Sequence, residues 1–152
     1  STLSSSSAAS DVYKRQLVNS TEDRLIVFYN FTEEMERLKG IAKGLNRPVS
    51  VLSGEEKNLD AYRYQHNSIT FIQYQAGAMG GNYQKANKII YYTLPLGKGS
   101  CDLWEQSKKR IHRIGQKNTC FYYYLLVKGS FEEKNFAALQ EGKELTDELF
   151  KD

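Results

Sequence analysis

The residues best suited to chemistry lie in the run Gln106–Gln116, which holds a glutamine and two arginines at regular spacing. If this run is helical, Gln106, Arg110 and Arg113 occupy positions i, i+4 and i+7 and project from one face. Arginine stays charged and offers a rigid planar set of N–H donors, which suits a phosphate whose negative charge is rising. The spacing therefore predicts a triphosphate site, and the alternative is a solvated basic helix face.

A second candidate is the glycine-rich stretch Gln73–Asn82, which directly follows an apolar run. Its glycines let the backbone approach a ligand closely and adopt positive φ. Backbone N–H groups in such a loop are able to hold phosphate or sugar oxygens. We therefore predict cofactor contacts at Gly77, Gly80, Gly81 and Asn82, and the alternative is a tight turn without a ligand.

Alternating strands and helices must position these two segments. Nearly continuous apolar runs predict buried strands at residues 24–30, 49–52, 68–74, 88–93 and 119–127. Helical spacing and end signals predict helices from an N-cap at Thr32 to Gly44 or Asn46, from Ser53 to near Gln65, over Asp102–His112, after an S-x-x-E capping box at Ser130, and over Thr146–Phe150.

This alternation predicts an α/β domain with three layers, α/β/α, around a mainly parallel sheet. Open sheets of this kind bind ligands at the carboxyl ends of their strands. Because the glycine stretch and the arginine run both follow strands, we expect them to meet at that edge.

Three segments resemble motifs of one family. The run Gln106–Gln116 resembles motif VI of superfamily 2 helicases, in the Q-x-x-x-R-x-x-R-x-G-Q form of Swi/Snf-type ATPases. Residues 76–83 resemble motif V, near A-G-G-x-G-x-N-L, except that Ala78 replaces a glycine and Tyr83 replaces the leucine. The strand Leu25–Phe31 resembles motif IV and is assigned no chemistry.

The resemblance covers roughly residues 24–140 and implies the C-terminal RecA-like domain of a Swi/Snf-like DNA helicase or translocase, of the compact type seen in phages and prophages. It implies that Arg113 is the arginine finger at the γ-phosphate of ATP and that Arg110 is its neighbour on the same phosphate edge. Gln106 would couple the nucleotide to closure of the lobes. The implied partners are DNA, bound through its backbone, and an N-terminal RecA-like lobe that holds Mg²⁺.

The chain contains no G-x-x-x-x-G-K-[ST] and no acidic D-E-x-H or D-E-A-D box. We therefore expect it to be a fragment of an ATP-hydrolysing enzyme that is inactive without the N-terminal lobe. The alternative is a non-catalytic nucleic-acid-binding α/β module. An unrelated doubly wound nucleotide enzyme is disfavoured because no G-x-G-x-x-G follows the first strand.

The N-terminal residues 1–16 resemble a translated sequencing adapter. We expect them to be non-native and either disordered or adventitiously helical, with the helicase C-terminal domain spanning residues 17–152. There is no apolar h-region of a secretory signal and no apolar run near the ~20 residues of a membrane helix. We expect no membrane partner and a location in the cytoplasm of a bacterial host.

The net charge and the cysteine content indicate which kinds of ligand are compatible with this chain. The 152 residues carry a net charge of +3, which permits contact with nucleic acid. Cys101 and Cys120 are not in a C-x-x-C arrangement, which indicates reduced thiols and no metal site.

The remaining aromatic and basic residues leave two interpretations open. We expect core and edge contacts for Tyr122–Tyr124, and the alternative is base stacking. Either DNA phosphate contacts or a solvated rim is expected for Lys85, Lys88, Lys98, Lys108 and Lys109.

Overall fold

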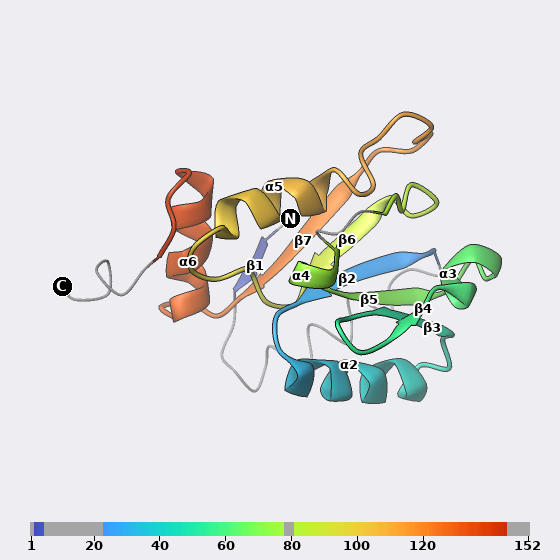
Figure 1. The fold of residues 1–152 in the computed structure, drawn as a ribbon. Helices are drawn as coiled ribbons and strands as arrows, with labels where there is room; N and C mark the ends of the chain where they lie inside the picture. Colours follow the sequence, from blue (N-terminus) through green and yellow to red (C-terminus); the bar gives the residue numbers. More distant parts are fainter. Residues whose placement is uncertain (1, 5–22, 78–80, 146–152) are drawn as a thin grey trace.

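The computed structural model describes residues 2–4, 23–77 and 81–145. In this part of the chain a single sheet has seven strands in the order β1-β7-β6-β2-β5-β3-β4 (Figure 1). The strands are β1 (Thr2–Ser4), β2 (Leu25–Tyr29), β3 (Val49–Leu52), β4 (Lys57–Asn58), β5 (Ile69–Gln73), β6 (Lys88–Tyr91) and β7 (Phe121–Leu126). Neighbouring strands run parallel except β3 and β4, which confirms the predicted α/β class with a mainly parallel sheet.

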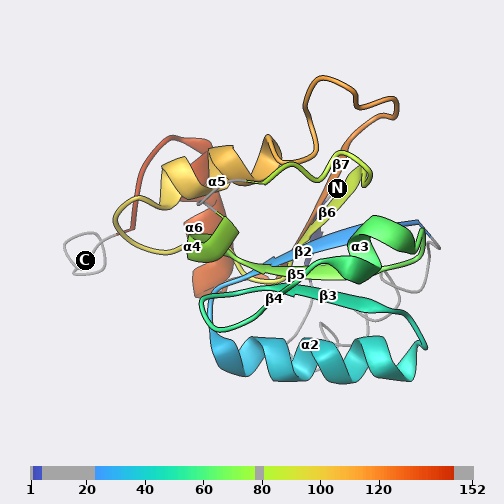
Figure 2. The same ribbon diagram turned by 45° about the vertical axis from the view of Figure 1, so that its right-hand side comes forward.

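Helices lie on both faces of this sheet, giving three layers (Figures 1 and 2). One face is covered by α2 (Thr32–Gly44), and α4 (Tyr74–Gly77) and α5 (Ser100–Lys108) lie over the other. The remaining described helices are α3 (Asp60–Tyr64) and α6 (Phe131–Gln140).

The central strand β2 is buried on both faces. Ile26 and Phe28 pack into the cluster beneath α5, whereas Val27 packs with Met35 and Leu38 of α2. Successive side chains of a strand point to opposite faces, so a strand covered on both sides needs an unbroken apolar run. This requirement explains why the apolar runs of the sequence located the strands of the described core.

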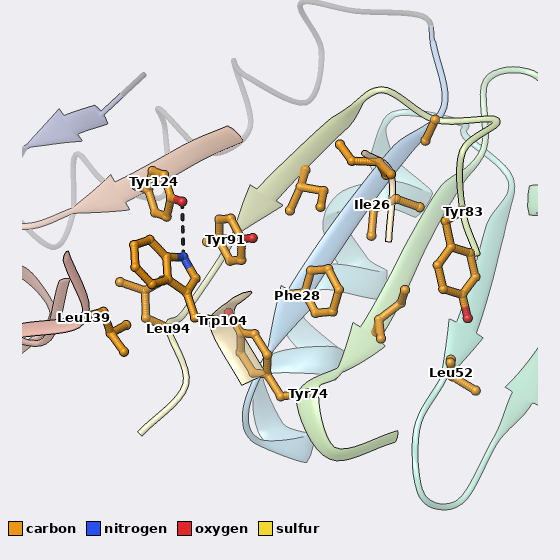
Figure 3. Packing of buried hydrophobic residues seen from close by; sticks show 14 of the residues in the cluster. Ile26, Phe28, Leu52, Tyr74, Tyr83, Tyr91, Leu94, Trp104, Tyr124 and Leu139 are labelled. Carbon is orange, nitrogen blue, oxygen red and sulfur yellow. Dashed lines mark hydrogen bonds between the residues drawn. The ribbon is translucent and has the colours of Figure 1, made fainter. Parts of the chain in front are cut away.

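Aromatic side chains seat α5 on the sheet. The Tyr91 ring stacks on Tyr124 with centroids 4.7 Å apart, and the Trp104 Nε1–H donates to the Tyr124 hydroxyl at 3.2 Å (Figure 3). The Tyr91 hydroxyl lies 2.6 Å from Ser107 Oγ on the buried face of α5. Burial raises the pKa of the Tyr91 phenol well above its usual value, so the group stays neutral. These contacts hold α5 against the sheet, and the chain continues from α5 directly into the residues around Arg110 and Arg113.

Two tyrosines of β7 pack in or against the hydrophobic core. Tyr124 is buried, and the hydroxyl of the partly buried Tyr122 donates to the carbonyl of Lys108 at 3.1 Å. The prediction of core and edge contacts for these two tyrosines is confirmed, because both rings pack in or against the cluster beneath α5.

The start of α2 differs by one residue from the predicted position. Phe31 occupies the N-cap position, and its backbone N–H donates to Glu34 Oε1 at 2.9 Å. Thr32 is therefore the first helical residue and does not cap the helix. At the other end Gly44 is the last helical residue, and Asn46 adopts a positive φ of 58°.

The helix predicted from Ser53 to Gln65 is wrong over its first half. Ser53 closes a turn, because its Oγ accepts the N–H groups of Glu55 and Glu56 and its own N–H donates to the Glu56 carbonyl at 2.8 Å. The chain then runs back antiparallel to β3 as β4 and forms only the short helix α3. Hydrogen bonds of a serine to neighbouring backbone groups favour turns over helices.

At the amino end, the structure places Thr2–Ser4 in a strand parallel to β7, where disorder or a helix was expected. The other residues of 1–16 and the predicted helix Thr146–Phe150 lie outside the described residues. Among the helices that are described, none has both the length and the apolar character needed to cross a membrane.

Candidate functional site

The segment Lys109–Gln116, called the arginine turn below, is not part of the helix that precedes it. The predicted helix over Asp102–His112 begins at Ser100 and stops at Lys108, so Arg110 and Arg113 follow it in a loop. The one-face grouping of these arginines with Gln106 is therefore wrong. The helix stops because Lys109 and Arg110 donate their N–H groups to carbonyls only three residues back.

Long-range contacts hold this turn in its shape. The buried Ile111 anchors it, and the Gln116 side-chain amide donates to the carbonyls of Ile111 at 3.0 Å and Ala86 at 2.8 Å. Gly115 adopts a positive φ of 96°, which glycine tolerates without strain. A continued helix would need the Ile111 carbonyl, so Gln116 stabilises the turn in preference to the helix.

The glycine loop lies against this turn. The Tyr83 N–H donates to the Arg110 carbonyl at 2.7 Å, and Arg110 Nη1 donates to the Gly81 carbonyl at 3.2 Å. Gly77 is the last residue of α4, and Gly80 lies outside the described residues. The structure thus brings together Gly81, Asn82 and both arginine positions, but at the other edge of the sheet. The segment after α5 contacts Ala86 and Asn87, directly before β6, and leads into the start of β7, so the arginines lie at the amino ends of these strands and their predicted carboxyl-edge position is wrong.

Two surface grooves flank the loop. Groove A is lined by Asn82, Gln84, Lys109, His112, Arg113 and Ile114. Groove B is lined by Leu52, Ser53, Gly54, Lys57, Leu59, Arg63, Gln75, Ala76, Gly81, Asn82 and Tyr83. Asn82 belongs to both linings, so the loop forms a wall that the two grooves share.

Groove A suits an anion. All six of its lining residues are neutral or basic. Arg113 is exposed, and among the described residues its guanidinium has neither a hydrogen bond nor an ion pair. A free guanidinium fork beside a lysine is a recognised arrangement for binding a phosphate.

Groove B also carries positive charge. Lys57 and Arg63 are exposed along it, and the only short ion pair of Arg63 with a described residue is the loose 3.7 Å contact with Asp60. Sequence reasoning missed both residues because it placed them on a long solvated helix. The Ser53-Gly54 turn signal directly after an apolar strand could have identified the position of Lys57 at the carboxyl end of β3.

The other nominated residues lie apart from the grooves. Gln106 is exposed on α5, and within the described part of the chain it lines neither groove. Lys88 pairs with Asp23 at 2.9 Å, and Lys108 lies over the Trp104 ring and pairs with Glu105. Of the five lysines nominated for DNA, Lys109 alone appears in the lining of a groove among the described residues.

Two arginines act on the buried phenol of Tyr83, which lines groove B. Burial raises the pKa of the Tyr83 phenol, and the positive charges of Arg110 and Arg63 oppose that rise. The buried hydroxyl therefore stays protonated between two cations. In the described residues, no group of three or more His, Cys, Asp or Glu side chains is placed to hold a metal ion.

No family model matches the sequence. Among curated proteins, the chain is 31% identical over 129 residues to ATP-dependent helicase fft3 of Schizosaccharomyces pombe, covering 79% of this chain and 14% of that protein. It is 25% identical over 134 residues to the human DNA repair and recombination protein RAD54-like, covering 83% of this chain and 18% of that protein. The chain thus matches one short segment of each of these relatives.

The fold agrees with a solved structure. The C-terminal part of the Fun30 ATPase domain matches with a TM-score of 0.71 and 21% identity, over 91% of this chain and 46% of that one. This likeness confirms the three-layer, RecA-like α/β fold.

Proposed function

We propose that this chain is the C-terminal RecA-like lobe of an ATP-dependent DNA helicase or translocase of the Swi/Snf-like superfamily 2 class. The observation that carries the proposal is the Arg113 guanidinium, which lines groove A beside Asn82 and has no partner among the described residues. The similarity to ATP-dependent helicase fft3 and to the RAD54-like proteins supports it.

In this proposal groove A faces the nucleotide held by a first lobe. ATP supplies the phosphoryl group whose transfer to water drives the motor. Arg113 stabilises the negative charge that develops on that group, as an arginine finger does. Lys109 and Asn82 line the same groove and fit a polyanion, whereas Gln106 on α5 faces the partner lobe and responds to its closure.

Mg²⁺ would be held by the first lobe, which would carry the Walker A lysine and the acidic box. The residues of this chain fit the phosphate edge of ATP better than the metal, because groove A is lined by cations and amides and not by carboxylates. Magnesium prefers oxygen ligands, above all carboxylates and phosphates.

Groove B is proposed to hold the DNA backbone. Lys57 and Arg63 offer two positive charges, and Ser53, Gln75 and Asn82 offer polar groups along the same groove. Contacts of this kind bind phosphates without reading the bases, so we expect little sequence preference.

The double variant Lys57→Ala/Arg63→Ala is expected to weaken binding to duplex DNA of any sequence. The slope of log K against log salt should become shallower by about one for each phosphate that the variant no longer neutralises. Fluorescence anisotropy with labelled DNA at several salt concentrations measures both quantities.

The matched control is Lys98→Ala/Lys128→Ala, which removes the same charge from exposed positions outside both groove linings. It should leave the slope within error of the parent. Equal loss of affinity in the two double variants would mean that groove B is not the DNA site and that only net charge matters.

We further propose that the parent protein belongs to a phage or prophage and acts in the cytoplasm of a bacterial host. The compact, tyrosine-rich form of the sequence supports this proposal, with 11 tyrosines in 152 residues. An intact genomic copy of the reading frame tests it, since flanking phage genes are expected and a eukaryotic chromosomal context would contradict it.

A further inference from the structure

We propose that Arg110 is a positioning residue that locks the glycine loop to the Arg113 turn, so that groove B controls groove A. This inference rests on the proposed function of the two grooves. Arg110 contacts the loop twice, since its Nη1 donates to the Gly81 carbonyl at 3.2 Å and its own carbonyl accepts the Tyr83 N–H at 2.7 Å. The side chain and the backbone of one residue thus hold both ends of a three-residue segment.

That segment has little freedom to adjust. Gly81 has a φ of 121°, and a Cβ at this position would lie 2.6 Å from the Tyr83 hydroxyl. Tyr83 is itself 3% exposed and packs edge-on against Tyr62, with centroids 5.3 Å apart. The Tyr62 hydroxyl in turn accepts the Lys85 N–H at 3.1 Å. The loop therefore rests on a fixed aromatic base, with Arg110 holding it from the other side.

Asn82 connects the segment held by Arg110 to both grooves. Asn82 lies between the two residues that Arg110 holds and lines both grooves. A ligand that displaces the backbone of Asn82 must move Gly81 or Tyr83, whose carbonyl and N–H are bonded to Arg110. Arg113 follows three residues later in the same tight turn, so the displacement reaches the guanidinium in groove A.

The arrangement separates the roles of the two arginines. Arg110 is partly buried and its guanidinium donates to a backbone carbonyl, whereas Arg113 is exposed in groove A. We infer that Arg113 meets the phosphate and that Arg110 transmits the state of the loop. The rival view, in which both arginines contact phosphate alike, predicts equal effects of their removal.

Arg110→Ala in the two-lobed protein tests the lock. It should reduce the stimulation of ATPase by DNA about ten-fold, while basal turnover changes less than about three-fold. Lys117→Ala, which removes a charge from an exposed position of the same loop, should leave both quantities unchanged. Arg110→Lys retains a donor for the Gly81 carbonyl and should restore most of the stimulation. Melting temperatures check that each variant folds.

Two outcomes would overturn the inference. One is a loss of basal turnover in Arg110→Ala as large as in Arg113→Ala, which would make Arg110 a phosphate contact. The other is normal stimulation of ATPase by DNA in Arg110→Ala.

A second measurement needs neither ATP nor the first lobe. In the 152-residue chain, Arg110→Ala should speed amide hydrogen exchange at Tyr83 about ten-fold, the change expected when one hydrogen bond from a charged group is removed. Lys117→Ala, an exposed position in the same loop, is the control. Unchanged exchange in Arg110→Ala would refute the lock itself. Faster exchange together with normal ATPase in Arg113→Ala would refute the proposed function and leave the lock intact.

Discussion

Arg113→Ala in the two-lobed protein is expected to lower the kcat for ATP hydrolysis by ~10³–10⁵, with little change in ATP affinity. This factor corresponds to about 4–7 kcal/mol of transition-state stabilisation. The effect falls on turnover because the interaction is realised only as charge develops on the transferred group. Steady-state ATPase assays at saturating DNA, together with nucleotide binding measured by fluorescence, separate kcat from affinity.

The structure predicts that this loss is not a folding defect. Arg113 is exposed, and the turn around it is held by Gln116 and the buried Ile111. Exposed substitutions of this kind typically change stability by less than about 0.5 kcal/mol. Lys117→Ala, which removes a charge from the same loop, should keep normal turnover. Normal turnover in Arg113→Ala as well would refute the finger assignment.

The second large effect is on stability. Tyr91→Ala should lower the free energy of unfolding by about 3–5 kcal/mol, the cost of deleting a large aromatic side chain from a core. Tyr91 stacks on both Phe28 and Tyr124, with centroids 5.9 and 4.7 Å away, and its hydroxyl meets Ser107 of α5. Its loss therefore removes the support on which α5 and the arginine turn rest.

Tyr91→Phe is the matched variant for this experiment. It keeps the ring and removes only the hydroxyl, and Ser107 Oγ still donates to the Trp104 carbonyl at 2.6 Å. We expect it to cost about 1 kcal/mol. Urea unfolding followed by the fluorescence of Trp104, the single tryptophan, measures both variants. A cost below about 1 kcal/mol for Tyr91→Ala would show that this contact does not seat α5.

Strands β2, β3, β5, β6 and β7 could be predicted because burial on both faces demands continuous apolar runs, whereas the short edge strands β1 and β4 carry no such run. Val27 illustrates this, since it is the middle residue of the central strand β2 and is buried within such a run. The S-x-x-E pattern at Ser130 also predicted the start of α6 correctly, because in the structure the Ser130 Oγ accepts the Glu133 N–H. These features depend only on residues that are close in sequence.

The end of α5 could not be predicted from local spacing. Gln106, Arg110 and Arg113 fit a helical period, but the bonds that end the helix come from distant residues. The Arg110 carbonyl, which a continued helix would offer to residue 114, instead accepts the Tyr83 N–H from 27 positions earlier in the chain. Tertiary contacts of this kind override a periodic pattern, because each supplies a hydrogen bond that the helix would otherwise make.

The residues of groove B were missed for a related reason. Lys57 and Arg63 fit an amphipathic helix when read locally, and their place beside Asn82 arises only when β4 folds back along β3. The strand argument predicted correctly that the glycine loop and the arginine turn are neighbours, but not the edge of the sheet at which the turn lies. It did not indicate that Arg110 binds the Gly81 carbonyl.

The most direct test of the account measures ATP hydrolysis by three samples: this chain alone, a first RecA-like lobe alone, and the two lobes joined in one protein. We predict that only the joined protein hydrolyses ATP, that DNA stimulates it, and that Arg113→Ala abolishes the activity. Arg113-dependent hydrolysis by this chain alone would contradict the composite site. An inactive joined protein that still binds DNA would favour a non-catalytic binding module.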